Sequence, residues 1–262
     1  MRRELIFRLK RTETIGVCVI LLLLLVFLLA LYVPNNTEML SEEILYDRES
    51  YFRAGFVPVV YGISCFFQGM LFLIAPIYGA VEMNADRKLG LLTQLKCVES
   101  EAVTIAKKTA SFSLFVAAVD ILSIPVGLLA NRYVSAHAPE YKISPAPDFR
   151  AVLDYAGLFL SCGIVIVIFY LAGLWVSILV RNLAVGIILA LVLYGLLGEA
   201  NLLNGISGIY CNKSVFLVTY LEPERIPDLP APVLWAVSIV FLALAFGITV
   251  LSLTEKKNGY ET

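Results

Sequence analysis

The side chains that could carry out acid–base or metal chemistry are few and far apart along this sequence. The only histidine, His137, lies in SAHAPEY, where its one close acidic neighbour, Glu140, follows Pro139. No second histidine and no cysteine stand near it in the sequence to complete a metal site. The phosphate-binding pattern G-x-x-x-x-G-K-[ST] is also missing, so the chain cannot form a P-loop. We therefore predict no catalytic residue, no metal site and no cofactor bound by this chain.

A single acidic residue, Asp120, interrupts the apolar stretch VAAVDILSIP. A charge near the centre of a bilayer costs about 2.5–3.5 kcal/mol on insertion scales, and such residues usually face a partner or a water-filled path. Asp120 is therefore either structural, protonated or bonded to a neighbouring helix near Pro125, or part of a pathway. An intramembrane aspartyl protease would need a second membrane carboxylate, and a serine protease would need a buried Ser–His pair. Neither kind of enzyme is favoured.

Residues 82–108, EMNADRKLGLLTQLKCVESEAVTIAKK, form a charged stretch between two strongly apolar ones. Apolar side chains recur in it at helical spacing: Leu91, Leu92, Leu95, Val98, Ala102, Ile105 and Ala106. The polar side consists of Asp86, Arg87, Lys88, Lys96, Glu99, Glu101, Lys107 and Lys108. Gly90 marks a weak point or a turn. The pattern predicts an amphipathic helical elbow that leads directly into the next apolar segment; an ordinary surface loop is the alternative.

The apolar segments on either side of this elbow are expected to lie within a lipid bilayer. The chain is 60% hydrophobic and only 16% charged, which is outside the range of an ordinary soluble domain. Spanning the hydrocarbon layer of a bilayer takes about 20 apolar helical residues. Six segments are candidates: 15–33, 55–81, 109–130, 155–180, 183–198 and 233–253. We therefore predict an all-α integral membrane protein with six transmembrane helices, of which the fifth is short.

The basic residues predict how these helices are oriented. Thirteen of the 20 Lys and Arg residues fall in 1–14, 82–108, 181–182 and 254–262, and the remaining seven fall in the longer segments between the other helix ends. Short loops rich in Lys and Arg remain in the cytoplasm. We therefore predict a multi-pass protein of the cell membrane with both termini cytoplasmic. The inner leaflet accounts for the basic residues, so no nucleic acid partner is expected.

Two further segments have a predicted place at the membrane surface. Residues 1–14 include a short amphipathic helix whose cations would face anionic lipid; a basic flank that only orients the first span is the alternative. Residues 199–232 are partly apolar, broken by Gly205 and Gly208 and closed by prolines. This pattern favours short re-entrant or interfacial helices at the outer surface, before the last span. A plain outer loop is the alternative.

The charged stretch resembles the permease signature of type-2 ATP-binding-cassette transporters. The residues that carry the resemblance are Glu82, Asp86, Arg87, Gly90, Leu92, Leu95, Glu101 and Lys107. Asp86 stands where Glu is usual, and KCVES replaces a connector that commonly contains proline. The resemblance extends to the architecture, so that residues 1–262 would form one transmembrane permease domain.

The resemblance implies a division of labour between subunits. A separate ATPase subunit, which binds ATP and Mg²⁺, would dock on residues 82–100 and push the elbow. A second permease copy, identical or a paralogue, would complete a path between the two chains, and transport would be export by alternating access. The alternative from another class is a six-helix membrane scaffold or channel that has no ATPase partner.

The predicted topology can be tested with two native cysteines. Cys97 lies in the cytoplasmic elbow and Cys211 in the outer segment. A membrane-impermeant maleimide added to intact cells is expected to label Cys211 and not Cys97. Labelling of Cys97 under these conditions would contradict the orientation.

Overall fold

The computed structural model consists of helices. It describes residues 12–27, 30–31, 33–35, 57–90, 99–137, 149–180, 182–199 and 231–258. The helices are α2 (Thr12–Phe27), α3 (Val33–Asn35), α5 (Val57–Lys88), α7 (Glu101–His137), α8 (Phe149–Leu179), α9 (Leu183–Glu199) and α11 (Ala231–Asn258). No strand occurs in these ranges, so the predicted all-α class is confirmed for this part of the chain.

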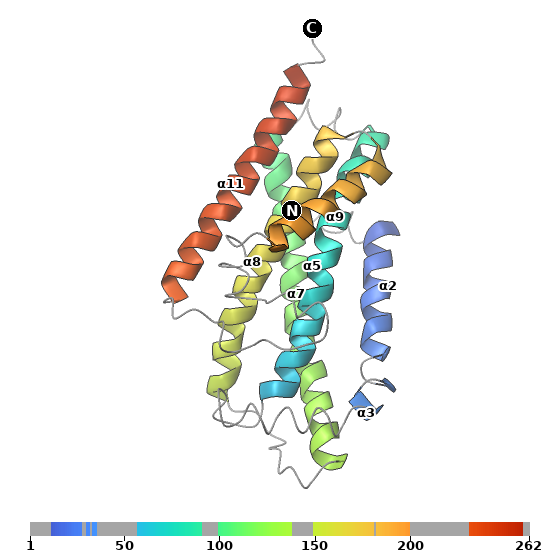
Figure 1. The fold of residues 1–262 in the computed structure, drawn as a ribbon, viewed down its shortest axis with the longest axis vertical. Helices are drawn as coiled ribbons and strands as arrows, with labels where there is room; N and C mark the ends of the chain where they lie inside the picture. The colour runs from blue at the N-terminus through green and yellow to red at the C-terminus, as the bar shows by residue number, and fades with distance from the viewer. Residues whose placement is uncertain are drawn as a thin grey trace.

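The longest helices form a bundle in which successive members run in opposite directions (Figure 1). α5 rises to the upper end, α7 descends from it, α8 rises again, and α11 climbs along the outside of α8. The most extensive packing is between α5 and α8, followed by α8 with α11 and α5 with α7. The N-terminal end of α9 follows the upper end of α8 directly, and α2 contacts α5.

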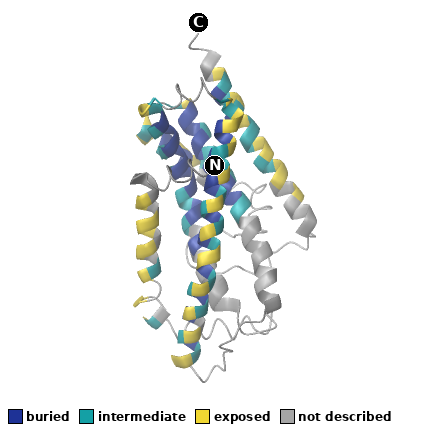
Figure 2. Cartoon of the chain, turned by 180° about the vertical axis from the view of Figure 1, so that it is seen from behind, coloured by how far each residue is buried: buried dark blue, intermediate teal, exposed yellow. Residues whose placement is uncertain are grey.

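Among the side chains that the structure describes, the buried ones are concentrated in the upper half of the bundle (Figure 2). The centre of this core is a group of three stacked rings, Tyr78 of α5, Phe112 of α7 and Tyr170 of α8. The rings of Phe112 and Tyr170 are nearly parallel, with centroids 4.2 Å apart. Offset stacks of this kind add to the stabilisation from burial alone, so the three helices are held closely together at this level.

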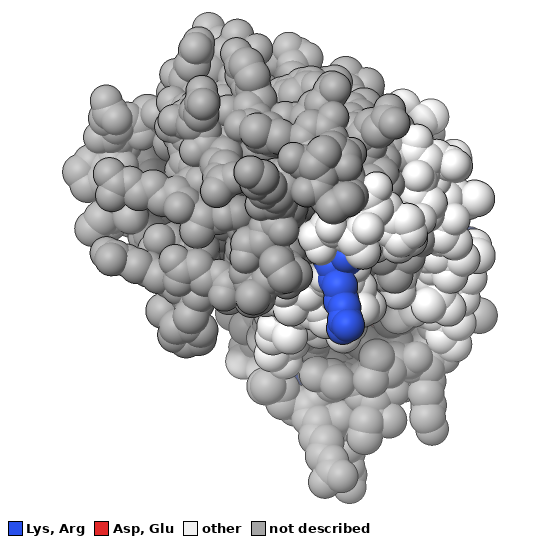
Figure 3. All heavy atoms as spheres, turned by 90° about the horizontal axis from the view of Figure 1, so that it is seen from below, with Lys and Arg blue, Asp and Glu red and all other residues white. Residues whose placement is uncertain are grey.

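Figure 3 shows the lower end of the molecule, opposite to the three stacked rings. The described atoms in this view are mostly uncharged, with basic atoms and no acidic atoms among them. α7 ends near this face, at His137, whose ring stacks on Tyr133 with centroids 4.0 Å apart. The sequence placed His137 in a loop. The structure instead makes it the last residue of α7, which continues through Pro125 to this point.

The predicted elbow is not a separate helix. Residues 82–88 complete α5 and residues 101–108 begin α7, so a short connector, residues 89–100, is all that remains between them. The physical reason is that residues 82–88 contain no helix-breaking residue, and the first one is Gly90, with a φ of 66°. Residues 91–98 lie outside the described part of the chain.

The number of membrane spans remains a prediction. By length and composition, α7 is the one helix of the described ranges that is long and apolar enough to cross a membrane. Shorter apolar helical stretches are Cys18–Phe27, Gly163–Leu179, Leu183–Leu193 and Ile239–Glu255. The predicted amphipathic helix in 1–11 and most of the outer segment 199–232 lie outside the described residues.

The ring stack predicts a difference between two positions of α7. Phe112→Ala removes a fully buried ring that stacks with both Tyr78 and Tyr170 and is expected to lower the free energy of unfolding by about 3 kcal/mol. Leu114→Ala, two residues further along the same helix, removes an exposed side chain and is the matched control. Thermal unfolding of the purified variants in detergent measures both. Equal effects would contradict the proposed core.

Candidate functional site

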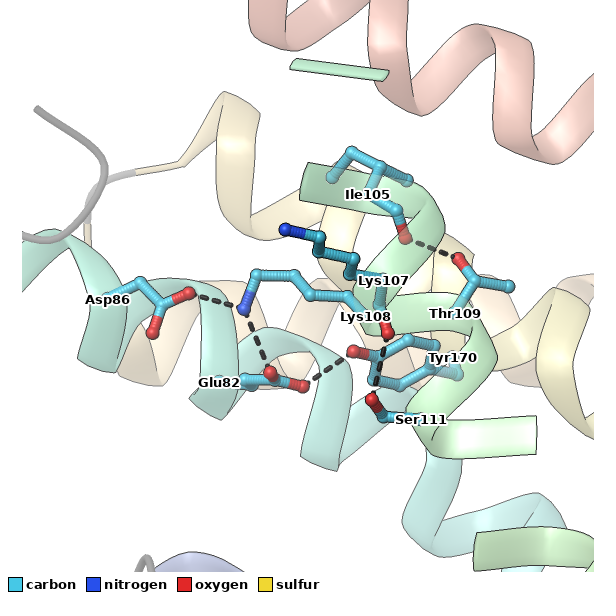
Figure 4. Close-up of polar contacts among 8 residues, drawn as sticks. All are labelled: Glu82, Asp86, Ile105, Lys107, Lys108, Thr109, Ser111 and Tyr170. Carbon is cyan, nitrogen blue, oxygen red and sulfur yellow. Dashed lines mark hydrogen bonds and ion pairs between the residues drawn. The ribbon is translucent and has the colours of Figure 1, made fainter. Parts of the chain in front are cut away.

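The upper end of the bundle contains a buried group of charged and polar side chains, which we call the charge cluster: Glu82, Asp86, Lys108 and Tyr170 (Figure 4). The ammonium group of Lys108 donates to Glu82 Oε1 at 2.8 Å and forms a second ion pair with Asp86 Oδ2. The Tyr170 hydroxyl donates to the other carboxylate oxygen, Glu82 Oε2, at 2.5 Å. The exposed fractions of Glu82, Asp86 and Lys108 are 2%, 2% and 4%.

Each member of the charge cluster is placed by the register of its helix. Glu82 and Asp86 are four residues apart on α5, and side chains at this spacing lie on the same face of a helix. Lys108 lies on the inward-facing stripe of α7, and Tyr170 belongs to α8. Buried charges are tolerated when they are paired and hydrogen-bonded. The cluster therefore requires the ends of three helices to keep one mutual arrangement.

Arg87 makes a further link between α5 and α8. Its guanidinium donates to the carbonyl oxygens of Ser177 at 2.6 Å and Val180 at 3.3 Å. These carbonyls belong to the C-terminal end of α8, where carbonyl groups have no partner within the helix and the helix dipole is negative. Arg87 thus supplies hydrogen bonds to carbonyls at the end of α8. The next helix, α9, begins at Leu183, and the side chain of Asn182 before it accepts hydrogen bonds from the amides of Ala184 and Val185.

The first end of the connector is fixed by a glycine turn. Gly90 has a φ of 66°, and its N–H donates to the carbonyl of Arg87 at 3.1 Å. A left-handed residue just past the last turn is a common way to end a helix, and glycine adopts it without steric cost. Lys88 and Leu89 are exposed here, Leu89 at 61% of its surface.

At the second end of the connector, Ser100 caps the start of α7. The Ser100 hydroxyl accepts a hydrogen bond from the amide of Val103 at 3.4 Å, as an N-cap residue does. Glu101 lies in the first turn, where the helix dipole favours an acidic side chain. Lys107 pairs with Glu99 in a partly exposed ion pair.

The structure distributes the predicted coupling residues over several environments. Glu82 and Asp86 point into the protein and not outward, Arg87 caps α8, and Gly90 ends α5. Glu101 lies in the first turn of α7, and Lys107, further along this helix, pairs with Glu99. Leu92 and Leu95 lie outside the described residues.

Sequence reasoning missed two members of the charge cluster. Lys108 was assigned to the polar face of the elbow together with Lys107. Its helical phase was nevertheless readable, because Thr104, Ile105, Lys108, Ser111 and Phe112 form one stripe at spacings of three and four residues, and all are buried. Tyr170 gave no signal, since its helix is apolar on every side.

Asp120 lies well apart from the charge cluster. Twelve residues separate it from Lys108 along α7, a rise of about 18 Å. Its side chain is half-buried beside α8, where a Cβ added to Gly163 would lie 3.7 Å from Asp120 Oδ2. The described residues include no group of three His, Cys, Asp or Glu side chains that could hold a metal ion.

The charge cluster and Arg87 connect α5, α7 and α8, and residues 89–100 lie between α5 and α7 in the sequence. Comparison of the chain with protein-family models, with curated proteins and with solved structures yields no match. The function must therefore be argued from the residues themselves.

The two neighbouring lysines of α7 offer a matched test of this site. Lys108→Met leaves two buried carboxylates without their cation, and such losses typically cost about 3–5 kcal/mol. Lys107→Met removes a partly exposed pair, for which about 1 kcal/mol or less is expected. Thermal unfolding in detergent compares the two.

A triple variant separates loss of the charge balance from loss of packing. Adding Glu82→Gln and Asp86→Asn to Lys108→Met removes the buried negative charges and is expected to recover most of the lost stability. If Lys108→Met were no more destabilising than Lys107→Met, the charge cluster would not hold the helices together.

Proposed function

We propose that the chain is the transmembrane permease subunit of an ATP-driven exporter, with six spans and both termini in the cytoplasm. A separate ATPase subunit would push the connector between α5 and α7 and so change access to a transport path. The observation that carries the proposal is the charge cluster, because it joins both helices that flank the connector to α8. The resemblance of 82–108 to a permease signature supports the same assignment.

A membrane location is supported by the outward-facing side chains. Large apolar residues are exposed along α2, α7, α9 and α11, among them Leu23, Ile121, Leu122, Ile188 and Leu251. Extended apolar surfaces of this kind are unusual on soluble monomers. In a bilayer they would contact lipid tails. The alternating direction of α5, α7, α8 and α11 is the arrangement expected of consecutive spans joined by loops.

A push on the connector would be transmitted to three helices. Both ends of the connector are fixed, by the turn at Gly90 and by the Ser100 cap. The buried pairs with Lys108 oppose any separation of α5 from α7, and Arg87 opposes sliding of α5 along α8. Because Tyr170 and Arg87 join α5 to α8, the response would include α8 as well as α5 and α7.

The transport path is best placed at the outer surface of the bundle, against a second copy of the chain. The stacked rings of Tyr78, Phe112 and Tyr170 occupy the space between α5, α7 and α8 below the charge cluster. This filling argues against a channel through the middle of these three helices. ATP and Mg²⁺ would be bound by the ATPase subunit, since this chain has no P-loop.

Docking of the ATPase can be tested at the exposed end of α5. Leu89→Asp places a charge on an exposed apolar side chain beside the connector and is expected to reduce co-purification of the ATPase at least tenfold, with thermal stability unchanged. The candidate ATPase is sought by its P-loop among the reading frames next to the gene of this chain and is expressed together with the chain. Ala136→Asp, an exposed position at the far end of α7, is the matched control and should retain docking.

Hydrolysis in reconstituted membranes completes the test. The complex is expected to hydrolyse ATP, and the purified chain alone is not. Sustained hydrolysis by the chain alone, or equal docking of Leu89→Asp and the parent chain, would contradict the proposal. The second result would show that docking does not use the exposed end of α5, whereas no docking of an ATPase on the parent chain would favour a scaffold or channel without an ATPase partner.

A further inference from the structure

Immediately below the charge cluster, α5 and α8 cross with their backbones in contact. A Cβ added to Gly79 would lie 2.9 Å from the backbone nitrogen of Leu174 and even nearer to the carbonyl oxygen of Tyr170. A Cβ added to Gly173 would lie 2.8 Å from the carbonyl carbon of Pro76 and nearer still to its oxygen. Each glycine therefore faces the backbone of the opposite helix. We call this contact the glycine crossing.

The glycine crossing adjoins Pro76, which lies in the interior of α5; the other proline of this helix, Pro58, lies in its first turn. Pro76 has no N–H, so α5 lacks the backbone hydrogen bond to the carbonyl of Phe72, and its ring crowds the preceding turn. Helices bend most readily at such positions. Above Pro76, α5 is joined to α8 by the glycine crossing, by the Tyr170–Glu82 hydrogen bond and by Arg87. The same part of α5 is joined to α7 by the ion pairs of Lys108.

We propose that α5 is divided mechanically at Pro76. Its upper part, residues 77–88, moves as one body with the start of α7 and the end of α8, and the lower part, residues 57–75, bends relative to that body. Gly79 and Gly173 are positioning residues, because only their close contact lets the Tyr170 hydroxyl reach Glu82. The use of this hinge in transport rests on the proposed function, whereas the hinge itself does not.

Hydrogen exchange of the purified chain in lipid nanodiscs, measured by mass spectrometry, tests whether α5 moves as two parts that meet at Pro76. The experiment needs no ATPase. Segments that open together exchange together. Gly173→Val forces the crossing apart and is expected to speed exchange at least tenfold in 80–88, 104–112 and 171–179 together. Gly186→Val is the matched control, because a Cβ on this α9 glycine meets no atom within 4 Å. It should leave all three segments unchanged.

Two milder variants keep the test decisive if Gly173→Val does not fold. Gly173→Ala should produce the same joint response at smaller amplitude. Pro76→Ala restores the missing amide and is expected to slow exchange in the turn around residue 76 while 80–88 stay coupled to α8. Exchange that rises in 80–88 alone, or no change at residue 76, would overturn the hinge. A joint response together with failed ATPase docking would leave the hinge standing and refute the proposed function.

Discussion

The ion pairs of Lys108 with Glu82 and Asp86 are the constraint on which the upper half of the structure depends. Two carboxylates on one face of α5 cannot be buried without a cation, and α7 supplies it from its second turn. Buried ion pairs add little net stability compared with an apolar core, but breaking one is costly. Their main effect here is to select one arrangement of the helices. The stacked rings of Tyr78, Phe112 and Tyr170 can form only when α5, α7 and α8 are in that arrangement.

Hydrophobic runs and charge made the helical class and the position of the charged stretch predictable. The helix ends were not predictable in the same way. Residues 82–88 and 101–108 are rich in charge, and charged residues normally mark a solvated surface, so both were assigned to a separate elbow. The helices continue through them, and Lys108 of α7 forms ion pairs with Glu82 and Asp86 of α5. Such compensation between distant residues cannot be read from one segment at a time.

Which of two neighbouring lysines is buried was also not predicted from the sequence. Lys107 and Lys108 are identical in type and adjacent in sequence, and rotation by one residue about α7 separates a partly exposed pair from a buried one. The stripe of Thr104, Ile105, Ser111 and Phe112 contained the information needed to choose Lys108. Tyr170 could not be identified, because a tyrosine in an apolar helix is ordinary core material until its hydroxyl is seen to meet Glu82.

Polar and backbone contacts divide the bundle into parts of different stiffness. Above Pro76, α5 is held by charges, by the stacked rings and by direct backbone contact at Gly79 and Gly173. Below it, the contacts of α5 with α8 include side-chain packing such as the edge-on pair Phe72 and Phe169. Side-chain packing yields to small displacements more easily than paired charges do, because a lost ion pair leaves a buried charge behind. A force applied at the connector would therefore move the upper ends of α5, α7 and α8 together and be absorbed as bending further down.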